Sequence, residues 1–427
     1  MKILFIHQNM PAQYTHLATH FAKSLENQVV FITRRKDIEI PGVRKIRYEL
    51  ARKPRNDAHK YISMLDEQLL YGQAVARAVL KLLDDEFVPD IVCAHSGWGE
   101  ALFLKDLMPD VPLLIYAEFF YRARGSDMDF AVDNGIEYDR QFRTRMRNTH
   151  LLQSLVDSDW ALSPTIWQWQ QHPEIFRSKM SVVHDGIRTE VCKPDPDAEL
   201  PLPNGKILTR SDEVITYVTR NLEPYRGFDV FCAALPEIMK RRPNAHIVLI
   251  GGDETSYGTK PRDARNWRER VFKDIQIDPD RIHFMGRVPY SLYLKVIQVS
   301  RVHVYLTYPF VLSWSMLESM SAGCALVASS TAPVREVLVD RESGLLVDFF
   351  DKSQLVEAIC EMLGDEMLRM RLGENARQMV IDNFDLEGIC LPQQIKLIET
   401  LAAGQTPTTG NYTPLRPDAP HGTEKAR

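Results

Sequence analysis

TYPFVLSWSMLESMSAG, residues 307–323, is the stretch that decides how this chain folds. Two short apolar runs with β-branched residues flank it, RVHVYLT (301–307) and CALVASS (324–330), and both are typical of buried strands. Between these runs the spacing of apolar residues predicts a helix with Ser313 as its N-cap and Gly323 as its stop. The stretch therefore predicts a strand, helix, strand unit of a parallel sheet.

The start of this predicted helix is suited to binding phosphate. The backbone N–H groups of Ser313, Trp314 and Ser315 lie at the positive end of the helix dipole, which favours an anion. Glu318 follows about one and a half turns later and can accept hydrogen bonds from sugar hydroxyls. Together these groups are typical of a sugar-nucleotide site. An ordinary crossover helix with a solvated glutamate is the alternative.

Length and composition limit the number of domains, the kinds of partner and the compartment that we expect. The 427 residues suffice for two domains of about 200 residues each, and a formal charge of -5 gives no case for a nucleic-acid partner. Six scattered cysteines without a CxxC pair predict buried thiols in a reducing compartment, with neither disulfides nor a metal site. The N-terminus turns polar at His7, too soon for a signal peptide. We expect a cytoplasmic protein and leave peripheral contact with a membrane open.

The N-terminal half alternates strands with helices, and its polar residues of interest follow the strands. Residues 14–25 have helical spacing, with Leu17, Phe21 and Leu25 as the apolar positions. The alternation predicts a doubly wound parallel sheet, whose ligands collect beyond the carboxyl ends of the strands. The residues that fall at that edge are His7, His95, Trp98, Glu118 and Tyr121.

The rest of the chain repeats this organisation. Residues 185–210 are rich in proline, aspartate and glycine, as expected of a connector between a domain at 1–184 and a second one at 211–383. Both are predicted to be Rossmann-like and to face each other across a cleft. Residues 384–402 predict a C-terminal helix, and 403–427 lack periodicity and predict a disordered tail.

Arg220 and Arg226 carry the clearest chemical suggestion. They lie in TRNLEPYRGFDVF (219–231), where a turn follows a strand and a helix begins at about Phe228. Two guanidinium groups at one point bind a diphosphate and stabilise the charge that develops as it leaves. The alternative is a pair of solvated surface arginines. His95 is a weaker candidate for a functional residue, because a histidine at a strand end often has only a structural role.

Four segments resemble family 4 glycosyltransferases of the GT-B fold, of the kind acting in bacterial polysaccharide biosynthesis. TRNLEPYRG (219–227) resembles their arginine-containing loop, and residues 315–348 resemble their nucleotide-sugar segment. Residues 281–310 and 163–187 extend the resemblance, which is looser in the N-terminal half.

The resemblance implies a retaining transfer of a hexosyl group from a nucleotide-sugar donor to a saccharide or lipid-linked acceptor, without a metal or another cofactor. It implies that Arg220 and Arg226 bind the donor phosphates and that the helix at 384–402 crosses back to the first domain. We expect His95 and Glu118 to join the arginines in catalysis, and His7, Trp98 and Tyr121 to lie on the acceptor side. The expected donor-binding positions are Gly251, Gly286, Arg287, Val288, Leu312, Ser313, Trp314 and Glu318.

The chain also departs from the family pattern. Phe310 stands where the family usually has its first glutamate, which removes a hydrogen-bond acceptor for a sugar hydroxyl. Asp185 replaces the usual hinge asparagine, residues 7–13 (HQNMPAQ) lack paired glycines, and Glu118 stands where many members have a histidine. One hypothesis is that His95 or Glu118 has taken over part of the sugar contact.

Two other functions fit the same motifs. A nucleotide-sugar epimerase of this fold would act on the donor without an acceptor, and a binding subunit would have lost activity, for which Phe310 is the sequence hint. A dehydrogenase is disfavoured because the first strand is followed by HQNMPAQ and not by a GxGxxG turn.

Overall fold

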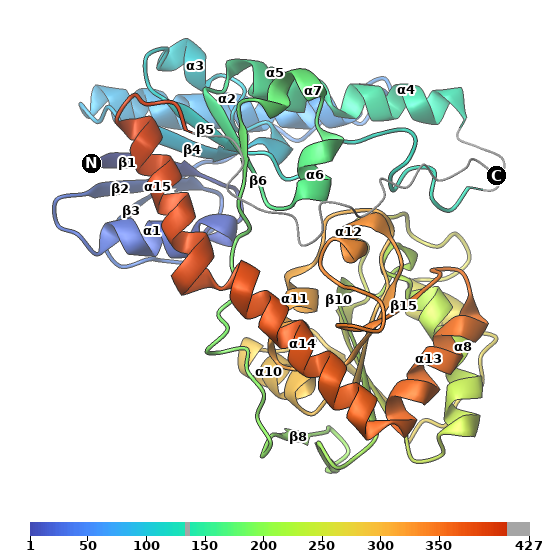
Figure 1. Ribbon diagram of the computed structural model, residues 1–427. Helices are drawn as coiled ribbons and strands as arrows, with labels where there is room; N and C mark the ends of the chain where they lie inside the picture. Colours follow the sequence, from blue (N-terminus) through green and yellow to red (C-terminus); the bar gives the residue numbers. More distant parts are fainter. Residues whose placement is uncertain (133–136, 408–427) are drawn as a thin grey trace. The chain divides into compact units, whose positions relative to one another are not determined.

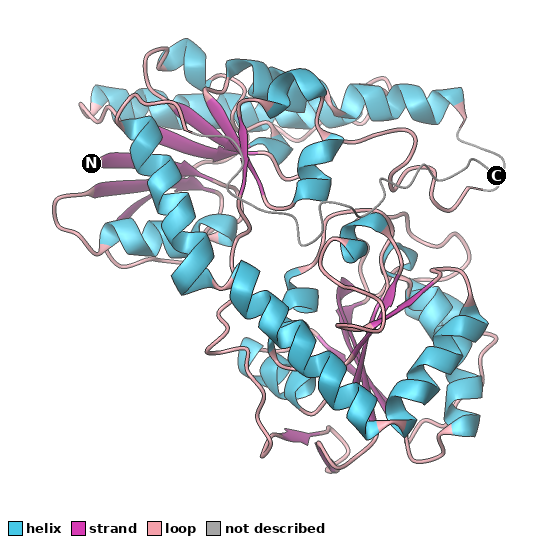
Figure 2. Ribbon diagram, viewed as in Figure 1, coloured by secondary structure: helices cyan, strands magenta, loops and turns pink. Residues whose placement is uncertain are grey.

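The protein folds as two α/β units, each with its own parallel sheet. A computed structural model describes residues 1–132 and 137–407 (Figure 1). One unit comprises Met1–Asp185 and the described residues from Glu387 on, and the other comprises Gly186–Leu386. Helices cover both faces of each sheet (Figure 2), so the prediction of two doubly wound Rossmann-like domains is confirmed.

The first unit contains a seven-stranded sheet in the order β3-β2-β1-β4-β5-β6-β7, with every neighbouring pair parallel. The chain winds outward from β1 to β3 and then returns on the other side of β1 as β4, so the topological switch point lies between β1 and β4. The strands are β1 (Lys2–Ile6), β2 (Gln28–Thr33), β3 (Val43–Arg47), β4 (Ile91–His95), β5 (Leu113–Tyr116), β6 (Trp160–Ser163) and β7 (Met180–Val182). The helices are α1 (Thr15–Ala22), α2 (Ser63–Asp84), α3 (Leu104–Leu107), α4 (Tyr138–Arg147), α5 (Thr149–Asp157), α6 (Ile166–Gln171), α7 (Glu174–Arg177) and α15 (Leu391–Ala402).

Apolar residues at helical spacing fix α2 on this sheet. Val75, Val79 and Leu82 are buried along one face of the helix, where they pack in the same core as Leu4 of β1 and Val92 of β4. The central strands are buried along most of their length because helices cover both of their faces.

The second unit contains a six-stranded parallel sheet in the order β12-β11-β10-β13-β14-β15. Its switch point lies between β10 and β13, by the same argument. The strands are β10 (Val214–Asn221), β11 (His246–Gly252), β12 (Ile282–Gly286), β13 (Val302–Tyr305), β14 (Leu326–Ser329) and β15 (Leu345–Val347), and β8 (Glu199–Pro201) and β9 (Ile207–Thr209) form a separate antiparallel pair. The helices are α8 (Phe228–Arg241), α9 (Trp267–Phe272), α10 (Tyr290–Gln298), α11 (Trp314–Ser321), α12 (Ala332–Arg335), α13 (Lys352–Gly364) and α14 (Glu366–Phe384).

Some expectations need correction. The helix expected at residues 14–25 ends at Ala22 as α1, and Leu25 is fully exposed, so the third apolar position does not face the core. Strand β3 and helices α4 and α5 were not predicted. The C-terminal segment is a π-helical turn, Leu386–Cys390, followed by α15, in which Gln394 donates a hydrogen bond to the His184 carbonyl at 2.7 Å.

Two further observations concern the ends of the chain and the membrane. The part of the predicted tail at 408–427 lies outside the described residues. Among the helices of residues 1–132 and 137–407, none combines the length and apolarity needed to span a bilayer.

Candidate functional site

Arg226 lies at the switch point of the second unit, in the 3₁₀ turn Pro224–Arg226 that follows β10. Its side chain is buried, yet it forms no ion pair with any described residue. Its Nη1 donates to Thr307 Oγ1 at 2.6 Å and to Tyr305 OH at 3.2 Å, and Nη2 donates to the Val311 carbonyl at 3.0 Å. A buried cation held only by neutral groups is costly, and an anionic ligand would compensate for that cost.

Tyr305 connects this guanidinium to the start of α11. Its hydroxyl also accepts the Ser313 N–H at 2.9 Å, and the Ser313 hydroxyl caps the helix by accepting the Ser315 N–H at 3.3 Å. The predicted N-cap and the predicted stop at Gly323, whose φ is 72°, are therefore present. The expectation that the N–H groups of both serines are available to phosphate was wrong, because both donate within the chain.

Arg220 differs from Arg226 in its surroundings. It stands near the end of β10 and is exposed to solvent. Among the residues that the structure describes, none forms a hydrogen bond or ion pair with its guanidinium. The edge of this sheet at the switch point therefore presents one fixed, buried cation and one exposed cation.

Glu318 is held by two tyrosines that the sequence analysis did not identify. Tyr290 OH donates to its Oε1 and Tyr293 OH to its Oε2, each at 2.8 Å. The two tyrosines are three residues apart on α10 and so share one face of the helix. Cys192 Sγ also donates to Oε1, at 3.9 Å, so the further lone pair for a ligand hydroxyl is on Oε2.

The other predicted donor-binding positions also follow strands of this sheet. Gly286 ends β12 with φ of 64°, and the next residue, Arg287, donates to Asn221 Oδ1 at 3.2 Å and pairs with Glu254. Gly251 lies in β11, where a Cβ atom would come within 2.9 Å of Leu222 Cδ2. The remaining positions differ in exposure: Leu312 is buried, Val288 is half-buried and Trp314 is exposed.

A buried carboxylate organises the loop beside Arg226. Glu223 accepts the backbone N–H groups of Ser256, Tyr257 and Gly258 at 3.1, 3.1 and 3.0 Å. This holds the Tyr257 ring 5.3 Å from the Arg226 guanidinium carbon. Sequence reasoning assigned Glu223 no role, because nothing in its local pattern shows that a loop 33 residues later closes over it.

Phe310 belongs to the same aromatic group. Its ring packs 5.0 Å from that of Tyr257 and 5.4 Å from that of Tyr225, and it lies 6.0 Å from the Arg226 guanidinium carbon. The position noted as a departure from the family pattern is thus an apolar, buried part of the wall around Arg226.

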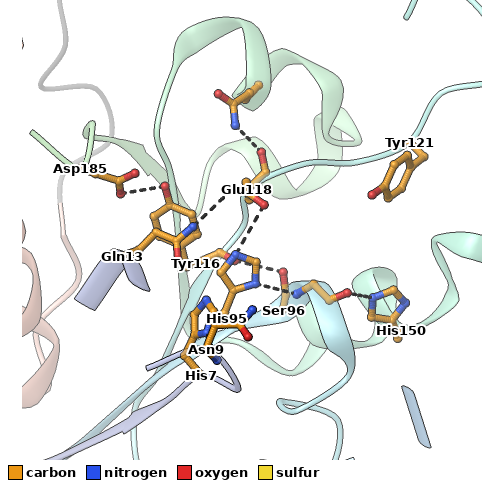
Figure 3. Close-up of polar contacts among 12 residues, drawn as sticks. His7, Asn9, Gln13, His95, Ser96, Tyr116, Glu118, Tyr121, His150 and Asp185 are labelled. Carbon is orange, nitrogen blue, oxygen red and sulfur yellow. Dashed lines mark hydrogen bonds and ion pairs between the residues drawn. The ribbon is translucent and has the colours of Figure 1, made fainter. Parts of the chain in front are cut away.

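In the first unit, His7 and His95 meet at the switch point between β1 and β4 (Figure 3), and the Trp98 ring packs against both of them. The rings of His7 and His95 are 5.0 Å apart, and Trp98 lies 4.9 Å from His7 and 4.5 Å from His95. With Glu118, whose Oε2 lies 3.7 Å from His95 Nε2, the structure brings together four of the five residues predicted at this edge.

Both histidines are neutral hydrogen-bond donors. The Nδ1 atom of His7 accepts the Asn9 N–H and that of His95 accepts the Gly97 N–H, each at 2.9 Å, so the ring proton lies on Nε2. Burial lowers the pKa of His7 to about 3 and that of His95 well below its usual range. Both Nε2 atoms are buried without a hydrogen-bond partner among the described residues, which suits them to a ligand oxygen.

Glu118 supplies the acceptor beside these donors. Its Oε2 lies 3.7 Å from His95 Nε2, and its Oε1 accepts Gln13 Nε2 at 3.4 Å (Figure 3). The Gln13 Oε1 atom and the Tyr14 hydroxyl are likewise buried and without partners among the described residues. Sequence reasoning missed Gln13, although its position in the loop after β1 was the available indication.

Tyr121 was predicted to lie at this edge, whereas Asp185 was noted only as a departure at the hinge position. Tyr121 lies apart from the histidines (Figure 3), with its hydroxyl accepting Arg147 Nη2 at 2.8 Å and the guanidinium 3.5 Å above its ring. Asp185, in contrast, reaches this edge, where it accepts the Tyr116 hydroxyl at 2.8 Å. Within the described chain, no three histidine, cysteine, aspartate or glutamate side chains lie close enough to hold a metal ion.

Comparison with known families matches most of the chain in two parts. Residues 25–192 match the model described as Glycosyl transferase family 4 group, and residues 204–379 match Glycosyl transferases group 1. The boundary between the two models falls near the division between the two units.

Curated relatives match over part of their length. D-inositol 3-phosphate glycosyltransferase of Corynebacterium efficiens is 26% identical over 203 residues, 45% of this chain and 46% of that protein. Phosphatidyl-myo-inositol mannosyltransferase of Mycolicibacterium smegmatis is 29% identical over 177 residues, 40% of this chain and 41% of that protein. The chain spans about half the length of the curated relatives it matches.

Solved structures share the fold over nearly the whole chain. Sucrose-phosphate synthase from Thermosynechococcus elongatus superposes with a TM-score of 0.70 at 18% identity, covering 95% of this chain and 100% of that one. HepE from Anabaena in complex with UDP-glucose superposes with a TM-score of 0.64 at 15% identity, covering 94% of this chain and 100% of that one.

Proposed function

Because this chain belongs to the family 4 glycosyltransferases of the GT-B fold, we propose that it transfers a sugar from a nucleotide-sugar donor to an acceptor hydroxyl. The observation that carries the proposal is the buried guanidinium of Arg226, which no described carboxylate neutralises. Tyr305 joins it to the positive end of α11. A diphosphate supplies the anion that both groups favour.

The second unit is the donor side in this proposal. Arg226 is fixed by three neutral partners and so needs little rearrangement when the diphosphate arrives, while the exposed Arg220 adds a second cation. Glu318, held by Tyr290 and Tyr293, accepts a ribose hydroxyl through the remaining lone pair of Oε2.

We propose that the transfer retains the anomeric configuration and needs no metal. The bond between the sugar's anomeric carbon and the diphosphate oxygen breaks as the acceptor oxygen bonds to that carbon on the same face. The acceptor proton passes to the departing diphosphate. Arg220 and Arg226 supply the positive charge that the leaving group requires, and this supports metal independence.

The first unit supplies contacts to sugar hydroxyls. Two neutral N–H donors, His7 and His95, stand beside the Glu118 carboxylate acceptor. This set suits an uncharged polyhydroxylated ring better than an anion, because burial keeps both imidazoles uncharged.

The acceptor belongs, in this proposal, to cell-surface polysaccharide or glycolipid assembly. Its support is the name of one relative, a phosphatidyl-myo-inositol mannosyltransferase, whose acceptor is a lipid. A saccharide or lipid-linked acceptor and peripheral contact with a membrane are both part of this proposal. The quoted relatives are named as transferases, and this favours transfer over the epimerase alternative.

Turnover with a donor panel tests the proposal. Purified protein is incubated with UDP-glucose, UDP-N-acetylglucosamine or GDP-mannose and with octyl glycosides as acceptors, while nucleotide release is measured. We expect acceptor-dependent release of a nucleoside diphosphate that EDTA leaves unchanged, and a glycoside whose one-bond coupling between the anomeric carbon and its proton matches the configuration of the donor.

Variants and alternative products complete the test. Arg220→Ala should reduce turnover at least tenfold. Arg241→Ala is the control and should not reduce it, because Arg241 lies at the C-terminal end of α8, where it pairs with Glu357. An isomerised donor without acceptor consumption would identify an epimerase, and nucleotide binding without turnover of any donor would identify a binding subunit. An inverted product or loss of activity with EDTA would contradict the proposed chemistry.

A further inference from the structure

Glu100 is a fully buried carboxylate that the proposed chemistry does not use. It follows Gly99, whose φ of 84° ends the turn that carries Trp98. Its Oε1 accepts the Tyr48 hydroxyl at 2.5 Å and its Oε2 accepts the Gln8 N–H at 3.2 Å. Both oxygens therefore connect the end of β4 to other segments of the first unit.

The Gln8 peptide is held from its other side as well. Its carbonyl accepts the Thr33 hydroxyl at 3.0 Å and the Arg34 N–H at 3.3 Å. The loop at residues 7–13 is thus fixed between the end of β2 and Glu100. His7 and Gln13, which face His95 and Glu118, stand at the two ends of this loop.

We propose that Glu100 is a positioning residue of the sugar-binding edge, which holds the loop at 7–13 so that His7 and Gln13 face His95 and Glu118. Its catalytic importance rests on the proposed function, whereas its hold on the loop does not. Glu100 acts through the backbone of Gln8 and touches none of the groups that would contact a sugar.

We expect the hold to depend on the protonation of the carboxyl, because the closed loop keeps it buried. Burial raises the pKa of Glu100 to about 7, although its hydrogen bonds from Tyr48 and Gln8 and the nearby Arg34 guanidinium each lower it. The other titratable side chains around it are Tyr14 and Tyr71, the latter bonded to Arg34.

Opening of the loop would hydrate the carboxyl and return its pKa toward 4.5. The closed loop therefore binds the proton more tightly than the open loop does, and closure weakens as the pH rises from about 5 through about 7, the pKa of the closed state. His7 contributes the opposite trend, because burial lowers its pKa. A comparison with a variant that lacks only the Glu100 titration removes the contribution of His7.

Hydrogen exchange of the peptide that contains residues 7–14, read by mass spectrometry at pH 6 and pH 8, tests the inference without any sugar. Glu100→Gln keeps an oxygen that accepts the Gln8 N–H, offers the Tyr48 hydroxyl an amide N–H in place of the carboxylate oxygen, and cannot titrate. The quantity compared is the equilibrium constant for loop opening. We expect this constant in the wild type, divided by that in Glu100→Gln, to rise about tenfold between pH 6 and pH 8. Glu100→Ala should increase loop opening at both pH values. Glu67→Gln, a change at an exposed glutamate, should show the same exchange as the wild type.

The outcomes separate this inference from the proposed function. The inference is overturned if the ratio of opening constants stays constant with pH, or if the loop in Glu100→Ala is as protected from exchange as in the wild type. Either result counts whatever the turnover shows. A ratio that rises supports the hold on the loop, and kcat/KM lowered in Glu100→Ala and restored in Glu100→Gln at pH 6 then supports positioning for catalysis. Protein that shows the exchange behaviour but turns over no donor contradicts the proposed function and not the hold on the loop.

Discussion

Arg226 and Glu318 lie at the same edge of one sheet, but the two charged side chains have different kinds of hydrogen-bond partner. Arg226 has only neutral partners, and Glu318 has two tyrosine hydroxyls that donate to it. The first arrangement leaves a net positive charge for a ligand anion, and the second orients a carboxylate without cancelling its charge. Each residue can therefore bind a different part of a sugar nucleotide.

The hydrogen bond from Tyr293 should contribute more to stability than the one from Tyr290. Tyr293 is 8% exposed and Tyr290 is 40% exposed, so water can replace only the Tyr290 hydroxyl at the carboxylate. We expect Tyr293→Phe to lower the free energy of unfolding by roughly 1.5 to 3 kcal/mol, and Tyr290→Phe by under about 1 kcal/mol. Urea denaturation of both variants measures the difference. Equal losses would show that burial does not set the strength of these bonds.

The buried histidines predict a dependence of stability on acid. The pKa of His7 is lowered to about 3 in the folded protein from 6.5, so the unfolded chain takes up the proton first as the pH falls. The contribution of neutral His7 is fully present above 6.5 and is lost below it, by roughly 1.5 kcal/mol between pH 6.5 and pH 5.

Variants at two histidines measure this contribution. His7→Asn keeps an acceptor for the Asn9 N–H and should reduce the loss of unfolding free energy over this pH interval, whereas the exposed His20→Asn should not. An unchanged pH dependence in His7→Asn would mean that His7 is hydrated or charged in the folded protein.

Strands and helices were predictable where one local pattern determines them. Ser313 and Gly323 bound α11 because capping is decided by a few neighbouring residues. Strand β3, VRKIR, escaped prediction because an edge strand can carry charged residues and none of its positions is fully buried. Helix α4 escaped because YDRQFRTRMR has only one buried position.

The packing of α2 gives a direct test of the core of the first unit. Leu82 is buried in the core and Leu80, on the same helix, is 46% exposed. Leu82→Ala should lower the free energy of unfolding by about 2 to 5 kcal/mol, and Leu80→Ala by much less, because only the first leaves a cavity. Equal losses in urea denaturation would contradict the assigned helix face.

The two units repeat one principle, a parallel sheet with polar side chains at its switch point. Sequence alternation predicted both sheets and placed His7, His95, Arg220 and Arg226 at their carboxyl edges, because chain order fixes where strands of a doubly wound sheet end. It could not predict that Arg226 is buried. That burial comes from residues 305–311, which lie about eighty positions later in the chain. The roles of Glu100 and of the two tyrosines of α10 were not predicted for the same reason, because their partners lie far away in the sequence.

Nucleotide binding tests most directly the claim that Arg226 and the start of α11 hold a diphosphate. The thermal midpoint of the purified chain is measured with UDP, GDP, ADP and CMP, in the wild type and in Arg220→Ala, Arg226→Ala and Arg241→Ala. A ligand at 100 times its dissociation constant contributes roughly 2.7 kcal/mol to the folded state, so a clear rise in the midpoint is expected with one nucleoside diphosphate. We predict that this rise falls in the variants of Arg220 and Arg226 and stays in that of Arg241. A rise of equal size in all four proteins, or none with any nucleotide, would contradict the account.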